Sequence, residues 1–213
     1  MEYSSDAKNK ILQAAADVFA EHGYRHGTIR QIAGKADMNV AAVNYYFGNK
    51  EALYQEVLKI WTETSFRKYP VTQNSGQETR PEEKLRYQIH QILSKLFDQE
   101  ETPWFGTLFV RMTTLETRDQ MKVLADRIYK PSVDLLTDIL REIIGRETDE
   151  DLLYFMATDI IGQCVFYYSN RELLELVLPE GGKEIMTVEY LSRRITGFSL
   201  SAVRNMPLDG DAL

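Results

Sequence analysis

The side chains that could carry catalysis are few and poorly grouped in this sequence. His22 and His26 stand four residues apart, a spacing that places two metal ligands on one face of a helix, but glycines flank them and no third ligand is apparent. Cys164 is the only cysteine, which excludes an intrachain disulfide and a clustered-cysteine zinc site. The sequence has no GxSxG nucleophile motif and no glycine-rich phosphate loop. We therefore expect no enzyme activity, no cofactor and no metal.

The remaining titratable groups fit ordinary surface roles. The acidic pair Glu100-Glu101 and the acidic run 149–151 stand at predicted helix ends, where carboxylates face water or favour the positive end of the helix dipole. His90 stands alone within a helical pattern and is expected to be an ordinary surface or core histidine.

A different chemistry, recognition of nucleic acid, fits the polar side chains near residue 44. Two short helices are expected at Thr28–Ala36 and Val40–Phe47, separated by the turn Asp37-Met38-Asn39. This spacing turns Val43 and Phe47 inward and leaves Asn44, Tyr45 and Tyr46 outside. It is the arrangement of a helix-turn-helix, whose second helix enters the DNA major groove. A generic helical hairpin is the alternative that the pattern leaves open.

The elements that must position these residues are helical. The first helix follows Ser5 or Asp6 and stops at Gly23, and the Thr28 hydroxyl can cap the helix after it. A fourth begins near Asn49 and runs to Phe66. Apolar spacing predicts further helices near 82–98, 103–116, 118–145, 149–171 and 183–204, with no convincing strand.

Breaks in this pattern are marked by proline, glycine and polar residues. The segment 67–81 is polar and contains Pro70, Gly76 and Pro81, so it is the interior loop or boundary. Pro131 should kink or split the helix in which it lies, because proline removes a hydrogen-bond donor and clashes with the preceding turn. A polar tail follows Asn205.

Length and composition favour an ordinary globular protein. The chain has 213 residues, of which 44% are apolar and 27% charged, and it shows no signal peptide and no uninterrupted apolar span. We expect a cytoplasmic protein that does not enter a membrane. The net charge of −7 argues against a general coat for nucleic acid, but residues 1–60 carry as many basic as acidic residues. This asymmetry indicates two functional regions.

A family resemblance rests on the stretch TIRQIAGKADMNVAAVNYYFGNKEALYQEV, Thr28 to Val57, together with the preceding helix KILQAAADVFAEHGY, Lys10 to Tyr24. These segments resemble the DNA-binding domain of the TetR family of bacterial transcriptional regulators. The block VNYYFGNKEALY and the region downstream are similar to the CecR-type subgroup. The resemblance implies an all-α protein with two domains. Residues 1–60 would form an N-terminal three-helix helix-turn-helix domain, and residues 61–213 a larger C-terminal helical domain for ligand binding and dimerisation.

Carried over residue by residue, the resemblance implies a set of DNA contacts. Asn44 would pair with adenine, while Val40 and Ala41 would pack on thymine methyl groups. The phosphates would be held by residues near helix N-termini or beside the groove, namely Thr28, Tyr45, Tyr46 and Lys50, with Arg30 as an additional phosphate or base contact. Partial core packing is the alternative role for Tyr45.

The sequence departs from the family pattern at two positions. Asp37 stands where a glycine commonly opens the turn, and aspartate tolerates unusual backbone angles better than most residues. Tyr46 stands where histidine is frequent, which puts the phosphate contact at this position in question.

The resemblance also implies a homodimer on a pseudo-palindromic operator. One domain offers few base-reaching side chains, so affinity must come from two copies. The expected interface joins apolar residues of the last helix to those of the 149–171 helix: Val188, Leu191, Ile195, Phe198 and Ala202 with Leu152, Met156 and Ile160. Packing of this stripe on its own subunit is the alternative.

A small-molecule effector is the other expected partner. The 103–116 helix is too apolar for a surface helix, and its Trp104, Phe105, Leu108 and Met112 could line an adaptable cavity in which Arg111 anchors an anionic group. Further cavity candidates are Tyr129, Gln163, Phe166 and Tyr167. Ordinary core packing, with the arginine reaching solvent, is the alternative.

The sequence therefore predicts a ligand-responsive, homodimeric repressor that binds a specific double-stranded operator. One alternative is a DNA-associated protein-interaction module of the same fold without a small-molecule inducer. The other is a helical enzyme or carrier whose N-terminal similarity is vestigial.

Overall fold

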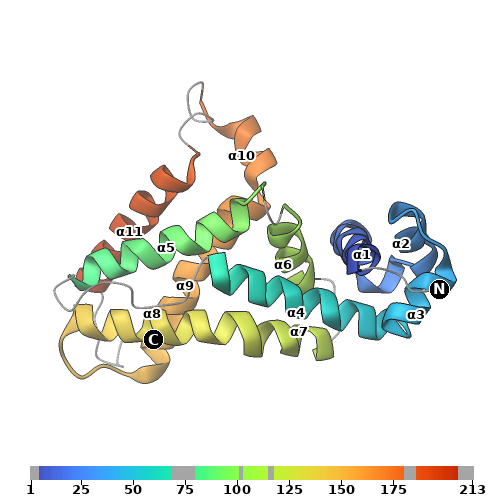
Figure 1. The fold of residues 1–213 in the computed structure, drawn as a ribbon. Helices are drawn as coiled ribbons and strands as arrows, with labels where there is room; N and C mark the ends of the chain where they lie inside the picture. The colour runs from blue at the N-terminus through green and yellow to red at the C-terminus, as the bar shows by residue number, and fades with distance from the viewer. Residues whose placement is uncertain (1–4, 69–79, 101–102, 115–117, 180–185, 206–213) are drawn as a thin grey trace. The chain divides into compact units, whose positions relative to one another are not determined.

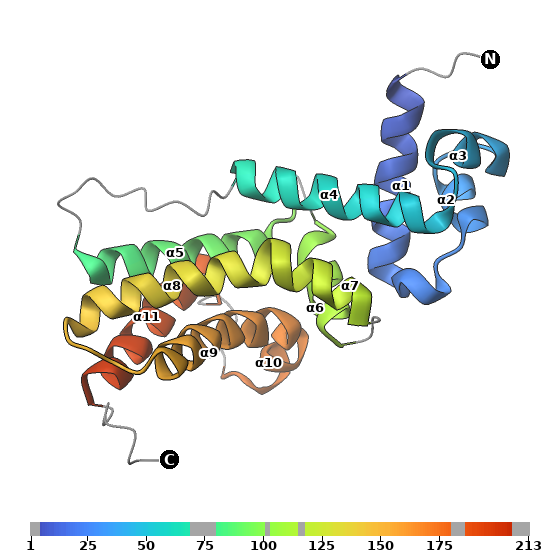
Figure 2. The same ribbon diagram turned by 90° about the horizontal axis from the view of Figure 1, so that it is seen from below.

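The described part of the chain is built from helices. The computed structural model describes residues 5–68, 80–100, 103–114, 118–179 and 186–205. The all-α class is confirmed. The helices, shown in Figures 1 and 2, are α1 (Ser5–His26), α2 (Ile29–Lys35), α3 (Val40–Phe47), α4 (Lys50–Lys68), α5 (Pro81–Phe97), α6 (Phe105–Thr114), α7 (Arg118–Leu124), α8 (Lys130–Ile144), α9 (Glu150–Ser169), α10 (Arg171–Val177) and α11 (Val188–Asn205), with a π-helical segment Ala125–Tyr129 before α8.

Two of the expected segments fall outside this description. Most of the predicted loop 67–81 and the tail after Asn205 lie outside the described residues. Among the residues that are described, none of the helices combines the length and the apolar character needed to cross a membrane.

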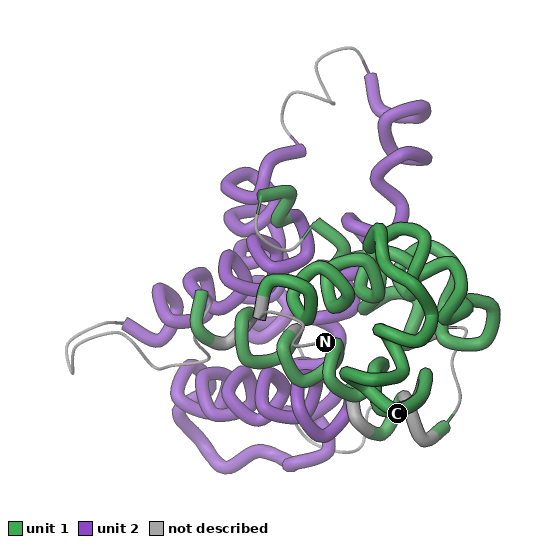
Figure 3. The backbone as a smooth tube through the Cα atoms, turned by 45° about the vertical axis from the view of Figure 1, so that its right-hand side comes forward, with its two compact units in different colours: residues 1–68, 98–124 green, residues 69–97, 125–213 purple. Residues whose placement is uncertain are grey.

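The helices gather into two compact units (Figure 3). One comprises residues 1–68 and 98–124, and the other residues 69–97 and 125–213. Helix α6 packs on α1 within the first unit. The compact units thus differ from the predicted domains 1–60 and 61–213, because residues 98–124 join the first unit. The functional roles of the two domains stay a prediction.

The first unit is organised by α1. Ile11, Ala15 and Phe19 recur at four-residue spacing and are fully buried. The helix is interrupted at Gly23, where φ is 73° and ψ is 170°, a conformation that side chains other than glycine rarely adopt. The predicted stop at Gly23 is therefore a break, after which one further turn reaches His26.

The turn between α2 and α3 depends on Asp37. Its φ is 54°, in the left-handed region, and it is the only described non-glycine residue with positive φ. The amide of Met38 donates to the Ala33 carbonyl at 2.9 Å, which closes the end of α2. The turn therefore survives without the glycine common in the family, as the sequence predicts.

The second unit is a bundle in which α5 and α9 pack against each other, and each of them also packs against α8 and α11. Leu85, Ile89 and Leu93 of α5 are fully buried and supply one side of the core. Val133 and Leu140 of α8 are also fully buried and supply another side of the core. Burial of this apolar surface is the main term that stabilises the bundle.

Pro131 divides the long predicted helix, as expected. The residues before it form the π-helical segment Ala125–Tyr129, and α8 begins at Lys130, one residue before the proline. Proline cannot donate to the turn before it, but the Ser132 hydroxyl donates to the Ile128 carbonyl at 2.9 Å. A local side chain thus satisfies a carbonyl in the disturbed turn.

The C-terminal helices differ from their predicted bounds. The expected 149–171 helix ends at Ser169, and α10 follows without having been predicted. The Asn170 side chain donates to the Phe166 carbonyl at 3.1 Å, so this residue competes with continuation of the helix. Helix α11 begins at Val188, five residues later than expected.

Replacing Asp37 tests the strain in the α2–α3 turn. Asp37→Val should lower the free energy of unfolding by about 1–2 kcal/mol, because a β-branched residue fits poorly at positive φ. Asp37→Gly is the control and should not lower it. Urea denaturation measures both changes, and equal stability of the two variants would contradict the prediction.

Candidate nucleic-acid interface

Helix α3 separates its residues cleanly into an inner and an outer face. Ala42 and Val43 are each 1% exposed and pack against the first unit's core. Val40, Ala41 and Asn44 are exposed on the other side, as predicted. Because the outer face holds one amide and two small apolar groups, it can approach base edges closely and offer both hydrogen bonds and methyl contacts.

Side-chain caps fix the N-termini of both α2 and α3. Asn39 accepts a hydrogen bond from the Ala42 amide at 2.7 Å, and Thr28 Oγ1 accepts from the Gln31 amide at 3.2 Å. The Gln31 side chain accepts in return from the Thr28 amide at 2.8 Å, which completes a capping box. The Thr28 cap is among the features predicted from the sequence, whereas the roles of Gln31 and Asn39 are not, although threonine followed three residues later by glutamine is a known signature.

The motif ends at a sharp corner before α4. Gly48 adopts φ 76° and ψ −60°, which a residue with a Cβ would strain to reach. Asn49 then accepts from the Ala52 amide at 2.9 Å and caps α4. The short α3 is therefore bounded by side-chain caps and by a glycine whose conformation fixes the direction of the chain.

A cluster of aromatic rings joins the end of α1 to the start of α4. Phe19 and Tyr54, both fully buried, meet edge to face with ring centroids 4.9 Å apart. The Tyr24 ring lies 4.9 Å from that of Tyr54. Lys50 closes the cluster, with Nζ 4.5 Å from the centroid of the Tyr24 ring and 3.3 Å from the Arg25 carbonyl oxygen.

The predicted phosphate-binding residues occupy different environments. Tyr45 is 70% exposed, so its alternative role in core packing is not seen, whereas Tyr46 is half-buried with its ring 6.1 Å from that of Phe47. Thr28 and Arg30 are exposed. The Thr28 hydroxyl is occupied by the capping box, and the Lys50 ammonium is held against α1.

Local charges around Lys50 are balanced. Hydrogen bonds from Gln55 and Tyr24 lower the pKa of the Glu51 carboxyl below its usual value. An ionised carboxylate therefore stands next to the Lys50 ammonium at the start of α4. Lys35 of α2 pairs with Asp17 of α1 at 3.2 Å, so this cation is partly neutralised.

Comparison with known proteins places this geometry in a family. Residues 11–57 match the model described as "Bacterial regulatory proteins, tetR family", and residues 81–203 match that of "HTH-type transcriptional dual regulator CecR, C-terminal domain". The chain belongs to the TetR family of bacterial regulatory proteins. The CecR regulator of Shigella flexneri is 48% identical over 187 residues, which cover 80% of this chain and 79% of that protein. The HTH-type transcriptional repressor KstR2 of Rhodococcus jostii is 33% identical over 76 residues, 36% of this chain and 37% of that protein.

Solved structures of TetR-like proteins share the fold. A TetR-like transcriptional regulator from Rhodococcus sp. RHA1 superposes with a TM-score of 0.70 at 15% identity, covering 96% of this chain and all of the other. FadR of Bacillus subtilis, solved in complex with stearoyl-CoA, gives 0.64 at 19% identity, covering 91% and 98%. These structures show the fold, while the family matches and the relatives identify the chain as a DNA-binding transcriptional regulator and do not favour the protein-interaction alternative.

The residues predicted for the dimer interface fall into two groups. Met156, Ile160, Leu191 and Ile195 are buried within their own unit, whereas Phe198 is 66% exposed. Leu152, Val188 and Ala202 are half-buried. On α9 the exposed apolar rings are instead Phe155 and Phe166, which sequence analysis did not assign to an interface.

The residues predicted to bind ligand are distributed over both compact units. In the first, Phe105, Leu108 and Met112 are at most 2% exposed and form core, as the alternative interpretation held. Arg111 is half-buried and donates to the Glu21 carbonyl at 2.8 Å, which ties α6 to α1. Trp104 is half-buried at the edge of a pocket that also involves α1 and α4.

In the second unit the remaining ligand candidates lie on two elements. Gln163 and Tyr167 of α9 line a groove with Phe198 of α11, and Tyr167 accepts a hydrogen bond from Arg194 at 3.2 Å. Phe166 is 52% exposed. Tyr129 ends the π-helical segment, where burial raises the pKa of its hydroxyl despite a hydrogen bond with Thr158.

Neither a reactive thiol nor a metal site is formed in the described regions. Burial raises the pKa of the Cys164 thiol to about 12, so this cysteine stays protonated and unreactive near neutral pH. Within those regions no group of three or more histidine, cysteine, aspartate or glutamate side chains could hold a metal ion.

Proposed function

We propose that this TetR-family regulator represses transcription as a homodimer on a pseudo-palindromic operator and releases the DNA when a small-molecule effector binds. The observation that carries the DNA-binding part is the outer face of α3. Val40, Ala41 and Asn44 are exposed on it, while caps at Thr28, Asn39 and Asn49 hold the motif in one geometry. A preorganised helix loses little conformational entropy when it enters the groove.

The proposed base contacts follow from side-chain chemistry. The nitrogen of the Asn44 side-chain amide can donate to adenine N7, and its oxygen can accept from the adenine N6 amino group. This bidentate pairing is specific for adenine. Val40 and Ala41 are small enough for thymine methyl groups to pack on them. Tyr45, Tyr46, Thr28, Arg30 and Lys50 are proposed to fix the register on the phosphates.

The proposed dimer surface comprises α9 and α11. Phe155, Gly162 and Phe166 follow one another at seven and four residues, which places these exposed residues on one face of α9. Gly197 and Phe198 are exposed on α11. Two copies of this surface would form a four-helix interface, with the glycines permitting close approach of the backbones.

Release by an effector requires two states with different operator affinity. We propose that the effector binds better to a state in which the two α3 helices have the wrong separation for successive major grooves. Helix α4, which follows the DNA-binding motif directly, is the proposed lever. KstR2 is a repressor and CecR a dual regulator by name, and repression is the outcome that we propose here.

Selection of bound fragments from random DNA tests the proposed function. The purified protein, at a stated salt concentration, should enrich a sequence whose two half-sites are related by a two-fold axis. The half-sites should be about one helical turn apart, since each subunit presents one α3 to the same side of the duplex. No enrichment by folded, dimeric protein would contradict the proposal.

Two variants separate base reading from phosphate binding. Asn44→Ala should weaken binding to the selected operator by about 1–3 kcal/mol and leave binding to scrambled DNA unchanged. Lys50→Ala should weaken binding to both and reduce the slope of log affinity against log salt by about one. Fluorescence anisotropy at several salt concentrations measures these effects. An unchanged slope for Lys50→Ala would mean that its ammonium serves only the α1–α4 junction.

A charge placed on the proposed dimer surface should separate the subunits. Phe198→Glu should give a monomer in analytical ultracentrifugation and bind the operator at least tenfold more weakly, because a monomer contacts one half-site. The fold should persist, since Phe198 is 66% exposed. The control is Met121→Glu, which alters another exposed apolar residue, 38% exposed, and should leave the dimer intact. A dimeric Phe198→Glu variant would exclude this surface.

A further inference from the structure

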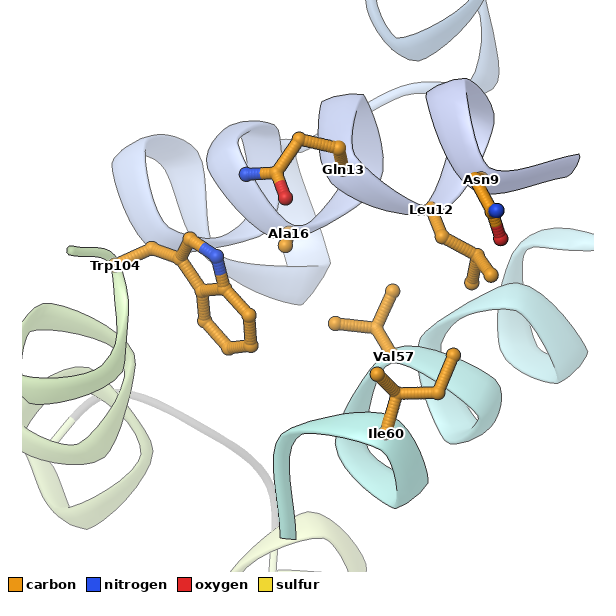
Figure 4. Close-up of a pocket in the computed structure, with 7 residues that line it drawn as sticks. All are labelled: Asn9, Leu12, Gln13, Ala16, Val57, Ile60 and Trp104. Carbon is orange, nitrogen blue, oxygen red and sulfur yellow. The ribbon is translucent and has the colours of Figure 1, made fainter. Parts of the chain in front are cut away.

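A pocket of about 200 Å³ opens between α1, α4 and the turn that leads into α6. Figure 4 shows its lining, in which α1 and α4 form two walls and the indole of Trp104 faces α1 from a third side. All three elements belong to the same compact unit. The lining residues are Asn9, Leu12, Gln13 and Ala16 of α1, Val57 and Ile60 of α4, and Trp104.

The walls are apolar and carry no charge. Leu12, Ala16, Val57 and Ile60 supply aliphatic surface, and Asn9 and Gln13 add neutral amides. The Gln13 amide group donates to Asp17 at 3.2 Å, so its nitrogen is already engaged. An ionic ligand would lose its hydration here without gaining a counter-charge, which selects for a neutral one.

The indole of Trp104 adds a hydrogen-bond donor to this lining. Its Nε1–H is buried and has no hydrogen-bond acceptor. A buried donor without a partner is unfavourable, and most such groups in proteins are satisfied by protein, water or ligand. Because the ring stands at the pocket wall, rotation of the side chain would turn this N–H toward an acceptor inside.

The dimensions restrict the ligand further. A cavity of about 150 Å³ lined by aliphatic groups can hold benzene, so a pocket of this size admits one ring with a short substituent. Long acyl chains and nucleotides exceed it. The occupant that fits the walls and the indole is a neutral, single-ring molecule with one hydrogen-bond acceptor.

The position of the pocket connects it to DNA binding. Its two longest walls are α1 and α4, the helices that the Phe19–Tyr54 ring contact joins beside the helix-turn-helix motif. We propose that this pocket is an effector site for a neutral, single-ring molecule with one hydrogen-bond acceptor, and that its occupation lowers operator affinity. The second part of this proposal rests on the proposed DNA-binding function, whereas the first does not.

Acetophenone is a suitable probe, with α-methylstyrene as its matched control. The two molecules have nearly the same shape, but the control has a methylene group in place of the carbonyl oxygen. Titration of ¹⁵N-labelled protein should shift the indole N–H resonance of Trp104 downfield with acetophenone. Trp61→Phe assigns the two indole resonances. Acetophenone should bind about tenfold more tightly than α-methylstyrene, and saturating acetophenone should lower affinity for the selected operator.

Two variants test the location of the site. Trp104→Phe should abolish the tenfold preference for acetophenone over α-methylstyrene, because it removes the donor and keeps an aromatic ring. Ile60→Phe should reduce the binding of both probes by filling the pocket from α4. The matched control is Ile144→Phe, which enlarges another half-buried isoleucine, in the second unit, and should leave both affinities unchanged.

The outcomes separate this inference from the proposed function. Absence of saturable binding, equal affinity for the two probes, or a preference retained by Trp104→Phe would overturn the binding site. Binding without a change in operator affinity would overturn its role as an effector site. Failure of the protein to select any operator would count against the proposed function and leave the resonance titration to decide the binding site. The dispersion of the amide spectrum shows in each case that the variant is folded.

Discussion

The contact between Phe19 and Tyr54 is the constraint on which the first unit depends. Both rings are fully buried, and their edge-to-face arrangement at 4.9 Å fixes how α1 meets α4. Tyr24 extends the cluster, and Lys50 covers it from the start of α4. Because α2 and α3 lie between these two helices in the chain, a change in the α1–α4 packing would be transmitted to the face of α3 that we propose to read DNA.

The helix-turn-helix motif illustrates how short helices are made rigid. Helices of seven and eight residues are not stable alone in water, so α2 and α3 rely on burial and on their caps. The side chains of Thr28 and Asn39 accept hydrogen bonds from backbone amides, and Ala42 and Val43 are buried in the core. The exposed side chain of Asn44 neither caps a helix nor packs in the core, so it is suited to contact a base.

The apolar side chains of the later helices serve different purposes that their spacing does not distinguish. Leu108 and Met112 of α6 are fully buried beside α1, and Arg111 is directed to the Glu21 carbonyl. On α9 the buried residues are interleaved with exposed aromatic rings at Phe155 and Phe166. The first arrangement completes a core, while the second leaves apolar area that a second subunit can cover.

The sequence by itself determined the elements whose signals are local. The bounds of α3, the Thr28 cap, the turn at Asp37 and the split at Pro131 all follow from side-chain and backbone preferences within a few residues. The outer position of Asn44 follows from helical periodicity alone.

Only the tertiary structure decided the features that depend on packing between distant segments. Helix α9 is apolar around most of its circumference, so periodicity could not choose between the predicted face at Met156 and the exposed face at Phe155. The position of Lys50 against Arg25, and the pocket formed by Ala16, Val57 and Trp104, each join segments far apart in the chain. No local pattern encodes such contacts, because they arise when separate helices fill space against one another.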